Sequence, residues 1–192
     1  MGGGITFATL ENFGQHYNGG LPLCPLSSRP YVQCRKEYDM YATMNGLFPG
    51  IVPSLKDIFD INSSVGFVSF ATAGQRMGEI KKALLQKDSM LAVAFAKRFD
   101  LKFDDLPGAL FFNQNVLRDI ALKLKGNPFD NTQTLYTGFP DNLKVNALAE
   151  RLPATQDQAK LFARYDRTGK IDKPVLLMHT IYDQLIPVSY AV

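Results

Sequence analysis

Hydrophobic residues recur at helical spacing along most of the chain, with polar residues between them. Side chains three and four positions apart share one face of a helix, so this spacing predicts amphipathic helices. One segment carries clear boundary signals as well, because Pro107 stands in the first turn of a predicted helix that Gly126 ends. The predicted helices cover residues 2–17, 31–48, 52–59, 72–86, 89–99, 105–125, 143–151 and 155–165.

Two short segments have a different pattern, a continuous apolar run bounded by turn residues. They cover residues 21–26 and 175–178. A continuous run is typical of a strand that is buried on both faces of a parallel sheet, whereas a half-exposed strand alternates. Pro174 suits the first position of a strand, because proline has no N–H to donate to a neighbouring strand. The sequence therefore predicts two buried parallel strands.

These elements together predict an α/β fold, a partial sheet with a large helical insertion between its two visible strands. The predicted domains are a core helix and strand at residues 1–26, a helical cap at residues 27–172, and a core strand with its following loop at residues 173–192. Ligands of open α/β sheets bind beyond the carboxyl ends of the strands. Asp183 follows the second predicted strand and is therefore a candidate site residue, although a surface turn residue would fit the same position.

Composition narrows the class of protein. The 192 residues are 46% hydrophobic and 20% charged, as in ordinary globular proteins, and the net charge of +3 is small. Basic residues are scattered among acidic ones, so no nucleic-acid partner is expected. No apolar run approaches the roughly 18 residues of a membrane span, and no signal peptide opens this chain, which leaves localisation open between a cytoplasmic protein and a secreted parent.

Few residues in the sequence could hold a metal ion or cofactor. His16 and His179 are the only histidines, and neither has a second ligand at metal-binding spacing, so neither a metal nor a cofactor is expected. Cys24 and Cys34 could pair or could remain buried thiols. An aromatic stripe at helical spacing fits either core packing or a substrate pocket; it consists of Tyr31, Tyr38 and Tyr41.

Both ends of the chain resemble a known family. The opening MGGGITFATLENFGQHYNGGLPLCPL is similar to the segment after the nucleophile of α/β-hydrolases, where G-x-S-M-G-G precedes a helix and then a strand. The segment KPVLLMHTIYDQLIPV resembles the strand and loop that carry the triad acid in that family. The resemblance identifies the chain as a fragment of a serine hydrolase with a helical cap, lacking the nucleophilic serine and the triad histidine.

The resemblance also implies roles for two residues. Asp183 would be the triad acid, which orients the histidine and stabilises its charged form, and the backbone N–H of Met1 would belong to the oxyanion hole. The intact enzyme would cleave a carboxylic ester or a peptide bond through an acyl-enzyme, with a small ester or peptide as its substrate. This chain alone would be inactive, because loss of the serine or the histidine costs about 10⁶ in rate.

A second interpretation belongs to another functional class. The chain would be a non-catalytic helical binding module, since its predicted helical insertion is large and it has no paired nucleophile and base. The type of substrate, the oligomeric state and the pairing of Cys24 with Cys34 stay open under both interpretations.

Overall fold

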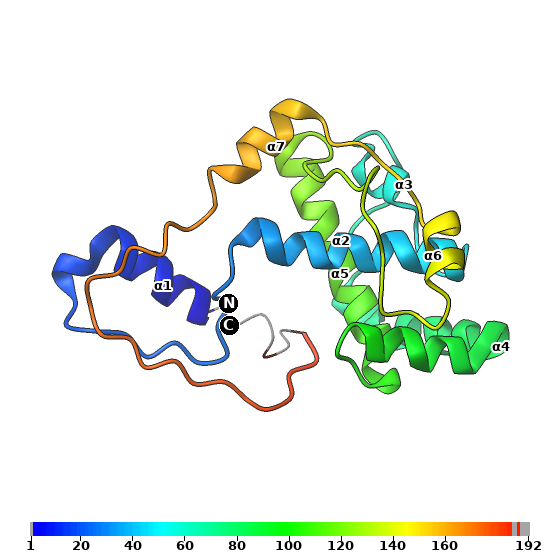
Figure 1. Ribbon diagram of the computed structural model, residues 1–192, viewed down its shortest axis with the longest axis horizontal. Helices are drawn as coiled ribbons and strands as arrows, with labels where there is room; N and C mark the ends of the chain where they lie inside the picture. The colour runs from blue at the N-terminus through cyan, green and yellow to red at the C-terminus, as the bar shows by residue number, and fades with distance from the viewer. Residues whose placement is uncertain (1, 186–187, 189–192) are drawn as a thin grey trace. The chain divides into compact units, whose positions relative to one another are not determined.

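The computed structural model describes residues 2–185 and residue 188, which form helices joined by irregular segments (Figure 1). The chain divides into two compact units. The terminal unit comprises Met1–Gln33 and Ala163–Val192, and the helical unit comprises Cys34–Phe162. In chain order the helices are α1 (Gly2–Phe13), η1 (Gly14–His16), α2 (Pro30–Leu47), α3 (Leu55–Phe59), η2 (Phe70–Thr72), α4 (Ala73–Arg98), η3 (Phe103–Asp105), α5 (Leu106–Leu124), α6 (Asn142–Leu148) and α7 (Gln156–Ala163).

The predicted α/β fold is wrong, because the described residues contain helices but no β-strand and no sheet. The two apolar runs do lie parallel, but they share only the isolated bridges of Gly20 with Val175 and Leu23 with Met178. Proline interrupts the first run, and its missing N–H shortens any ladder. The second run is not buried, since Leu176 is 66% exposed. Without flanking strands, such a pair forms no sheet with a covered face.

Close backbone contacts and one carboxylate organise the terminal unit. A Cβ on Gly3 would lie 2.6 Å from the Cα atom of Pro25, so only glycine lets α1 approach this segment. Farther along α1, the carboxylate of Glu11 accepts hydrogen bonds from the backbone N–H groups of Gly169 at 2.6 Å and Thr168 at 3.4 Å. These contacts join the two ends of the sequence within one unit.

The helical unit is built around α2 and α5. The hydroxyl of Tyr41, on α2, donates a hydrogen bond to the carbonyl of Leu110, on α5, at 2.6 Å. Helix α5 also packs against α3 and α4, as can be followed in Figure 1. Tyr38 and Tyr41 are completely buried, so the core-packing interpretation of the aromatic stripe is confirmed for these two residues.

Aromatic rings form much of the core of the helical unit. Phe129 lies at the centre of one cluster, with its ring centroid 5.2 Å from Tyr38, 6.1 Å from Phe59 and 5.5 Å from Phe162. Such tilted and edge-on pairs stabilise a core beyond the burial of their area. The cluster brings α2, α3 and α7 together around the irregular segment that follows α5.

Helix α4 contains a break that the sequence pattern placed almost correctly. Asp88 has φ −166° and ψ 98°, which are not helical values. Its carboxylate accepts a hydrogen bond from the N–H of Leu91 at 2.9 Å and so caps the second half of the helix. The two helices predicted at residues 72–86 and 89–99 therefore correspond to the two halves of α4.

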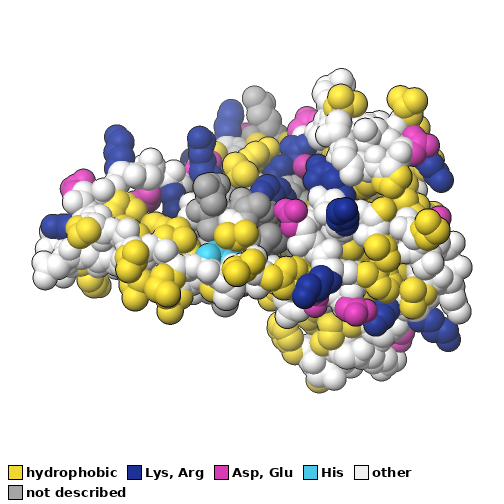
Figure 2. All heavy atoms as spheres, turned by 60° about the horizontal axis from the view of Figure 1, so that its bottom comes forward, with side chains coloured by type: hydrophobic (Ala, Val, Ile, Leu, Met, Phe, Trp, Pro, Cys, Tyr) yellow, Lys and Arg dark blue, Asp and Glu magenta, His cyan; other side chains and the backbone are white. Residues whose placement is uncertain are grey.

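The surface carries charges of both signs. Figure 2 shows blue basic and magenta acidic side chains interspersed with yellow hydrophobic ones on the face that it draws. The absence of a nucleic-acid partner stays a prediction. Several large hydrophobic residues of the helical unit are exposed, among them Leu143 at 87% and Met90 at 84%.

Candidate functional site

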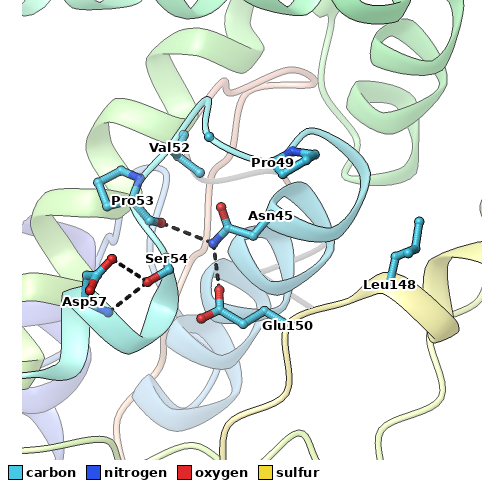
Figure 3. Close-up of a pocket in the computed structure, with 9 residues that line it drawn as sticks. Asn45, Pro49, Val52, Pro53, Ser54, Asp57, Leu148 and Glu150 are labelled. Carbon is cyan, nitrogen blue, oxygen red and sulfur yellow. Dashed lines mark hydrogen bonds between the residues drawn. The ribbon is translucent and has the colours of Figure 1, made fainter.

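A pocket of about 540 Å³ opens on the surface of the helical unit (Figure 3). Its walls come from the end of α2, the segment that leads into α3, the first turn of α3, and the end of α6 with the residues that follow. The lining residues are Asn45, Pro49, Gly50, Val52, Pro53, Ser54, Asp57, Leu148 and Glu150. Parts of the sequence about a hundred positions apart thus form one concave surface.

Glu150 fixes the pocket by binding the first turn of α3. Its Oε2 atom accepts a hydrogen bond from the backbone N–H of Leu55 at 2.8 Å, and its Oε1 atom accepts one from the N–H of Lys56 at 3.0 Å. The first N–H groups of a helix have no partner within the helix and carry partial positive charge. A carboxylate from a distant segment satisfies two of them here and attaches α3 to the chain after α6.

Ser54 and Asp57 complete the start of α3. The Ser54 hydroxyl accepts a hydrogen bond from the N–H of Asp57 at 3.0 Å and donates one to the Asp57 carboxylate at 2.7 Å. This is an N-cap with an acidic residue three positions later, a pattern that stabilises helix starts. The Ser54 hydroxyl therefore has a structural task and is held in a fixed orientation.

Arg118 holds the other end of α3. This arginine of α5 is 4% exposed and donates hydrogen bonds to the carbonyls of Ile58 and Asp60, each at 2.8 Å. Carbonyls at the end of a helix carry partial negative charge, so a cation is favoured there. The five-residue helix is thus fixed at both ends by side chains from elsewhere in the helical unit.

Asn45 connects α2 to both sides of the pocket. Its side-chain N–H₂ group donates hydrogen bonds to Glu150 Oε2 at 2.8 Å and to the carbonyl of Pro53 at 3.1 Å. Figure 3 shows the amide oxygen turned away from Glu150, toward the side where Val52 and Pro49 are drawn. The donors of Asn45 are therefore used within the protein, and its oxygen faces the pocket.

A buried polar network holds the segment that carries Glu150. It is centred on Asn131, which has no exposed surface. Its amide N–H₂ donates to the carbonyl of Glu150 at 2.7 Å and to the hydroxyl of Tyr136 at 2.9 Å. Its amide oxygen accepts from the N–H of Leu152 at 2.8 Å and from the hydroxyl of Tyr38 at 3.3 Å. The segment that carries Glu150 is thereby fixed to the core.

Asp39 belongs to the same network. Its Oδ1 atom accepts hydrogen bonds from Arg35 Nε at 3.0 Å and from the Tyr136 hydroxyl at 2.9 Å. Burial raises the pKa of Asp39 above its ordinary value of 3.8, although the charge of Arg35 opposes this shift. A raised pKa means that the folded state binds the proton more tightly than the unfolded state does.

We expect this carboxyl group to lower the free energy of unfolding as the pH rises above 3.8, because the unfolded state then loses its proton more readily than the folded state does. At lower pH both states are protonated, and the penalty is absent. NMR of the side-chain carboxyl carbon should show a titration midpoint for Asp39 above the ordinary value. Asp39→Asn should remove this signal and also the contribution of Asp39 to the pH dependence of the free energy of unfolding.

Asp130 is the internal control for that titration, because hydrogen bonds from Thr132 lower its pKa. The midpoint of Asp130 should therefore lie below the ordinary value. Midpoints of Asp39 and Asp130 that coincide would contradict the effect of burial on Asp39.

Asp183, predicted as the triad acid, is not among the residues that line this pocket. Asp183 is in the terminal unit, where it is half-buried and its Oδ1 atom accepts a hydrogen bond from the N–H of Leu185 at 2.9 Å. Met1, predicted for an oxyanion hole, lies outside the described residues. The catalytic role of Asp183 stays a prediction.

The two cysteines are free thiols, and they belong to different units. Burial, together with the nearby charge of Glu37, raises the pKa of the Cys34 thiol. Nucleophilic cysteines need a lowered pKa, so this environment disfavours reactivity. Within the described part of the chain, no group of three or more His, Cys, Asp or Glu side chains is placed to hold a metal ion. Nor is any helix there long and apolar enough to cross a membrane.

Comparison with protein-family models, with curated proteins and with solved structures finds no match for the chain. The identification as an α/β-hydrolase is therefore corrected, since no relative supports it and the described residues lack the parallel sheet that carries the triad in that fold. Short motifs at the two ends of a chain match by residue type alone, whereas a fold requires the intervening strands as well.

Sequence reasoning missed the pocket because its key pair is not local. Asn45 and Glu150 are 105 positions apart, and neither stands in a recognisable motif. Ser54 followed by Asp57 is the one local signal, since it fits the pattern of a helix start. That signal predicts where α3 begins, but it contains no information about the segment that packs against it.

Proposed function

We propose that the helical unit is a non-catalytic binding module and that its ligand occupies the pocket between α3 and the end of α6. The observation that carries the proposal is the fixed construction of this pocket: Glu150, Asn45 and Ser54 are held by internal hydrogen bonds, beside an apolar wall of Pro49, Val52 and Leu148. Preorganised walls bind without the entropic cost of ordering them.

The chemistry of the lining residues supports binding over catalysis. Acyl transfer needs a nucleophile next to a general base. The lining contains no His, Cys, Lys or Tyr, and its one hydroxyl, that of Ser54, caps α3. Both histidines of the sequence belong to the terminal unit. What remains is a shaped surface with polar acceptors.

The proposal is tested by NMR with three small probes of one shape and different charge, n-butylammonium, butyrate and n-butanol. At least one probe should shift the backbone amide signals of Leu55, Lys56 and Glu150 in a saturable manner. If none of the three does so at millimolar concentration, the proposed function is wrong. Saturable turnover of p-nitrophenyl acetate at the same pocket would contradict its non-catalytic character.

Helix α6 provides a matched pair of variants. Leu148 lines the pocket and is 49% exposed, whereas Leu143 on the same helix is 87% exposed and is not part of the lining. Leu148→Ala should weaken the binding of the effective probe roughly tenfold, because apolar contact area is lost. Leu143→Ala should leave binding unchanged. Equal effects of the two substitutions would place the ligand elsewhere.

A further inference from the structure

Asparagine is followed directly by glycine at two places in the chain, Asn18-Gly19 in the terminal unit and Asn45-Gly46 in the helical unit. An asparagine before a glycine can lose its side-chain amide without an enzyme, because the backbone nitrogen of the glycine attacks the Cγ atom of the asparagine. Glycine favours this step, since it has no Cβ to restrict the backbone conformation. The two pairs have the same sequence but different surroundings in the structure.

The pair in the terminal unit has the geometry that the attack requires. Asn18 lies in an exposed bend after η1, and Gly19 is exposed as well. Among the described residues, the side chain of Asn18 makes no hydrogen bond, and the N–H of Gly19 has no acceptor. The attacking nitrogen and the Cγ atom are therefore free to approach each other, and water reaches both.

The pair in the helical unit is protected, because Asn45-Gly46 lies inside α2. The side-chain nitrogen of Asn45, which would be the leaving group, donates hydrogen bonds to Glu150 Oε2 at 2.8 Å and to the carbonyl of Pro53 at 3.1 Å. The helix also fixes the backbone of Asn45 and engages the N–H of Gly46 in its own hydrogen bonds. The two reacting atoms cannot meet unless the end of α2 opens.

Asn62 shows that exposure alone does not provide the required geometry. This asparagine is exposed and precedes a small residue, Ser63. The N–H of Ser63, however, donates a hydrogen bond to the carbonyl of Asp60 at 3.0 Å. The turn therefore engages the nitrogen that would have to attack.

We propose that Asn18 is a site of spontaneous deamidation in the folded protein. The nitrogen of Gly19 forms a bond to Cγ of Asn18, the side-chain nitrogen leaves as ammonia with the proton of Gly19, and a cyclic succinimide remains. Water then cleaves either of the two C–N bonds at the ring carbonyls, which produces aspartate or isoaspartate. The whole reaction consumes water and releases ammonia. It is independent of ligand binding, because the pocket belongs to the helical unit.

Isoaspartate at this position would alter the contact between the two apolar runs. Its main chain passes through Cβ, so the backbone before Gly19 gains a CH₂ group. Gly19 has little room to move, because a Cβ there would lie 2.8 Å from the carbonyl oxygen of Pro174. The next residue, Gly20, donates a hydrogen bond to that oxygen and accepts one from the N–H of Leu176, each at 3.0 Å. Conversion should therefore weaken these two bonds.

The selectivity is tested on the folded full chain. The protein is incubated at neutral and mildly alkaline pH, and its peptides are analysed by mass spectrometry and with an isoaspartate-specific methyltransferase. Asn18 should convert at least roughly tenfold faster than Asn45 or Asn62, because only Asn18 reaches the near-attack geometry. The rate should rise with pH, since the attacking nitrogen must lose its proton. Conversion of Asn45 or Asn62 as fast as that of Asn18 would overturn the proposal.

The same chain in guanidinium chloride and a synthetic peptide of residues 15–21 provide the reference rates. In the unfolded chain Asn18 and Asn45 should convert at similar rates, because the helix and the bonds of Asn45 are then absent. A difference between them that is the same with and without guanidinium chloride would show that the fold does not select the site. Retention of the Asn18 amide in the folded chain while the peptide converts would also overturn the proposal.

Two variants test the structural consequence. Asn18→Gln lengthens the side chain, so the attack would have to form a larger ring, and isoaspartate should no longer appear at this position. Asn62→Gln changes another exposed asparagine in the same way and should leave conversion of Asn18 unchanged. After incubation, the amides of Gly20 and Leu176 should exchange with deuterium faster in the unmodified chain but not in Asn18→Gln. Equal acceleration in both would contradict the effect of isoaspartate on this contact.

Discussion

Replacing Gly46 with alanine is expected to destabilise the helical unit by roughly 3 kcal/mol, near the upper end for overpacked sites. A Cβ at this position would lie 2.6 Å from both the carbonyl carbon and the carbonyl oxygen of Leu148, and 2.8 Å from the backbone nitrogen of Ala149. Backbone atoms cannot turn aside as a flexible side chain can. The end of α6 would therefore have to move away from α2.

The same substitution should damage the pocket. Just after α6, the N–H of Glu150 donates a hydrogen bond to the carbonyl of Ala42 at 2.9 Å, so displacement of α6 pulls the carboxylate of Glu150 away from α3. Gly46→Ala should therefore lower the urea midpoint and shift the amide signals of Leu55 and Lys56 in the folded protein.

Gly78 provides the control. It lies inside α4, and a Cβ there would meet no atom within 4 Å. Alanine at this position should stabilise the helix by about 0.5–1 kcal/mol, because glycine loses more backbone entropy on folding. Urea unfolding followed by circular dichroism measures both variants. A midpoint for Gly46→Ala at or above that of the unmodified chain would disprove the close contact between α2 and α6.

Helices were the part of this fold that the sequence could predict. Their signals are local: Pro107 in the first turn of α5 and Gly126 after its end lie within the element that they delimit. The predicted segment at residues 105–125 accordingly matches α5, Leu106–Leu124, to within one residue at each end. The prediction at residues 143–151 runs past the end of α6 at Leu148, because Glu150 turns back to bind α3.

The apolar runs led to a wrong prediction of two buried strands, because an apolar run shows nothing about the strands and helices that would have to cover it. A run such as residues 175–178 fits a buried strand only if other strands and helices cover it, and those are separate segments of the chain. In the structure the run pairs with a segment that contains Pro22 and Pro25, neither of which has an N–H to donate. Two bridges result, with apolar side chains left exposed.

The candidate site could not be predicted from local sequence patterns either, because it too depends on contacts between distant segments. Its carboxylate, its amide and its helix start come from separate regions. Asn131 links two of them, because its side chain bonds to Glu150 and Leu152 and also to Tyr38 on α2, the helix that carries Asn45. Asp183 drew attention because it follows an apolar run, whereas Glu150 follows a helix end with no motif. Buried polar networks specify such long-range arrangements without leaving a periodic signal.

Replacing Asn131 with alanine is expected to cost about 3 kcal/mol of stability, because two backbone groups would lose their partner and two tyrosine hydroxyls would each lose one of two partners. The N–H of Leu152, the carbonyl of Glu150 and the hydroxyls of Tyr38 and Tyr136 all bond to this one side chain. Water cannot reach a side chain with no exposed surface without loosening the core around it.

Asn62→Ala is the matched control, since Asn62 is exposed and its side chain makes no hydrogen bond within the described part of the chain. Its free energy of unfolding should stay within about 0.5 kcal/mol of the unmodified protein. Asn131→Ala should also weaken ligand binding, because the carbonyl of Glu150 and the N–H of Leu152 lose the anchor that aligns the Glu150 carboxylate with α3. Equal unfolding energies for the two variants would show that the network does not hold the pocket in place, and the fixed geometry on which binding depends would then need another source.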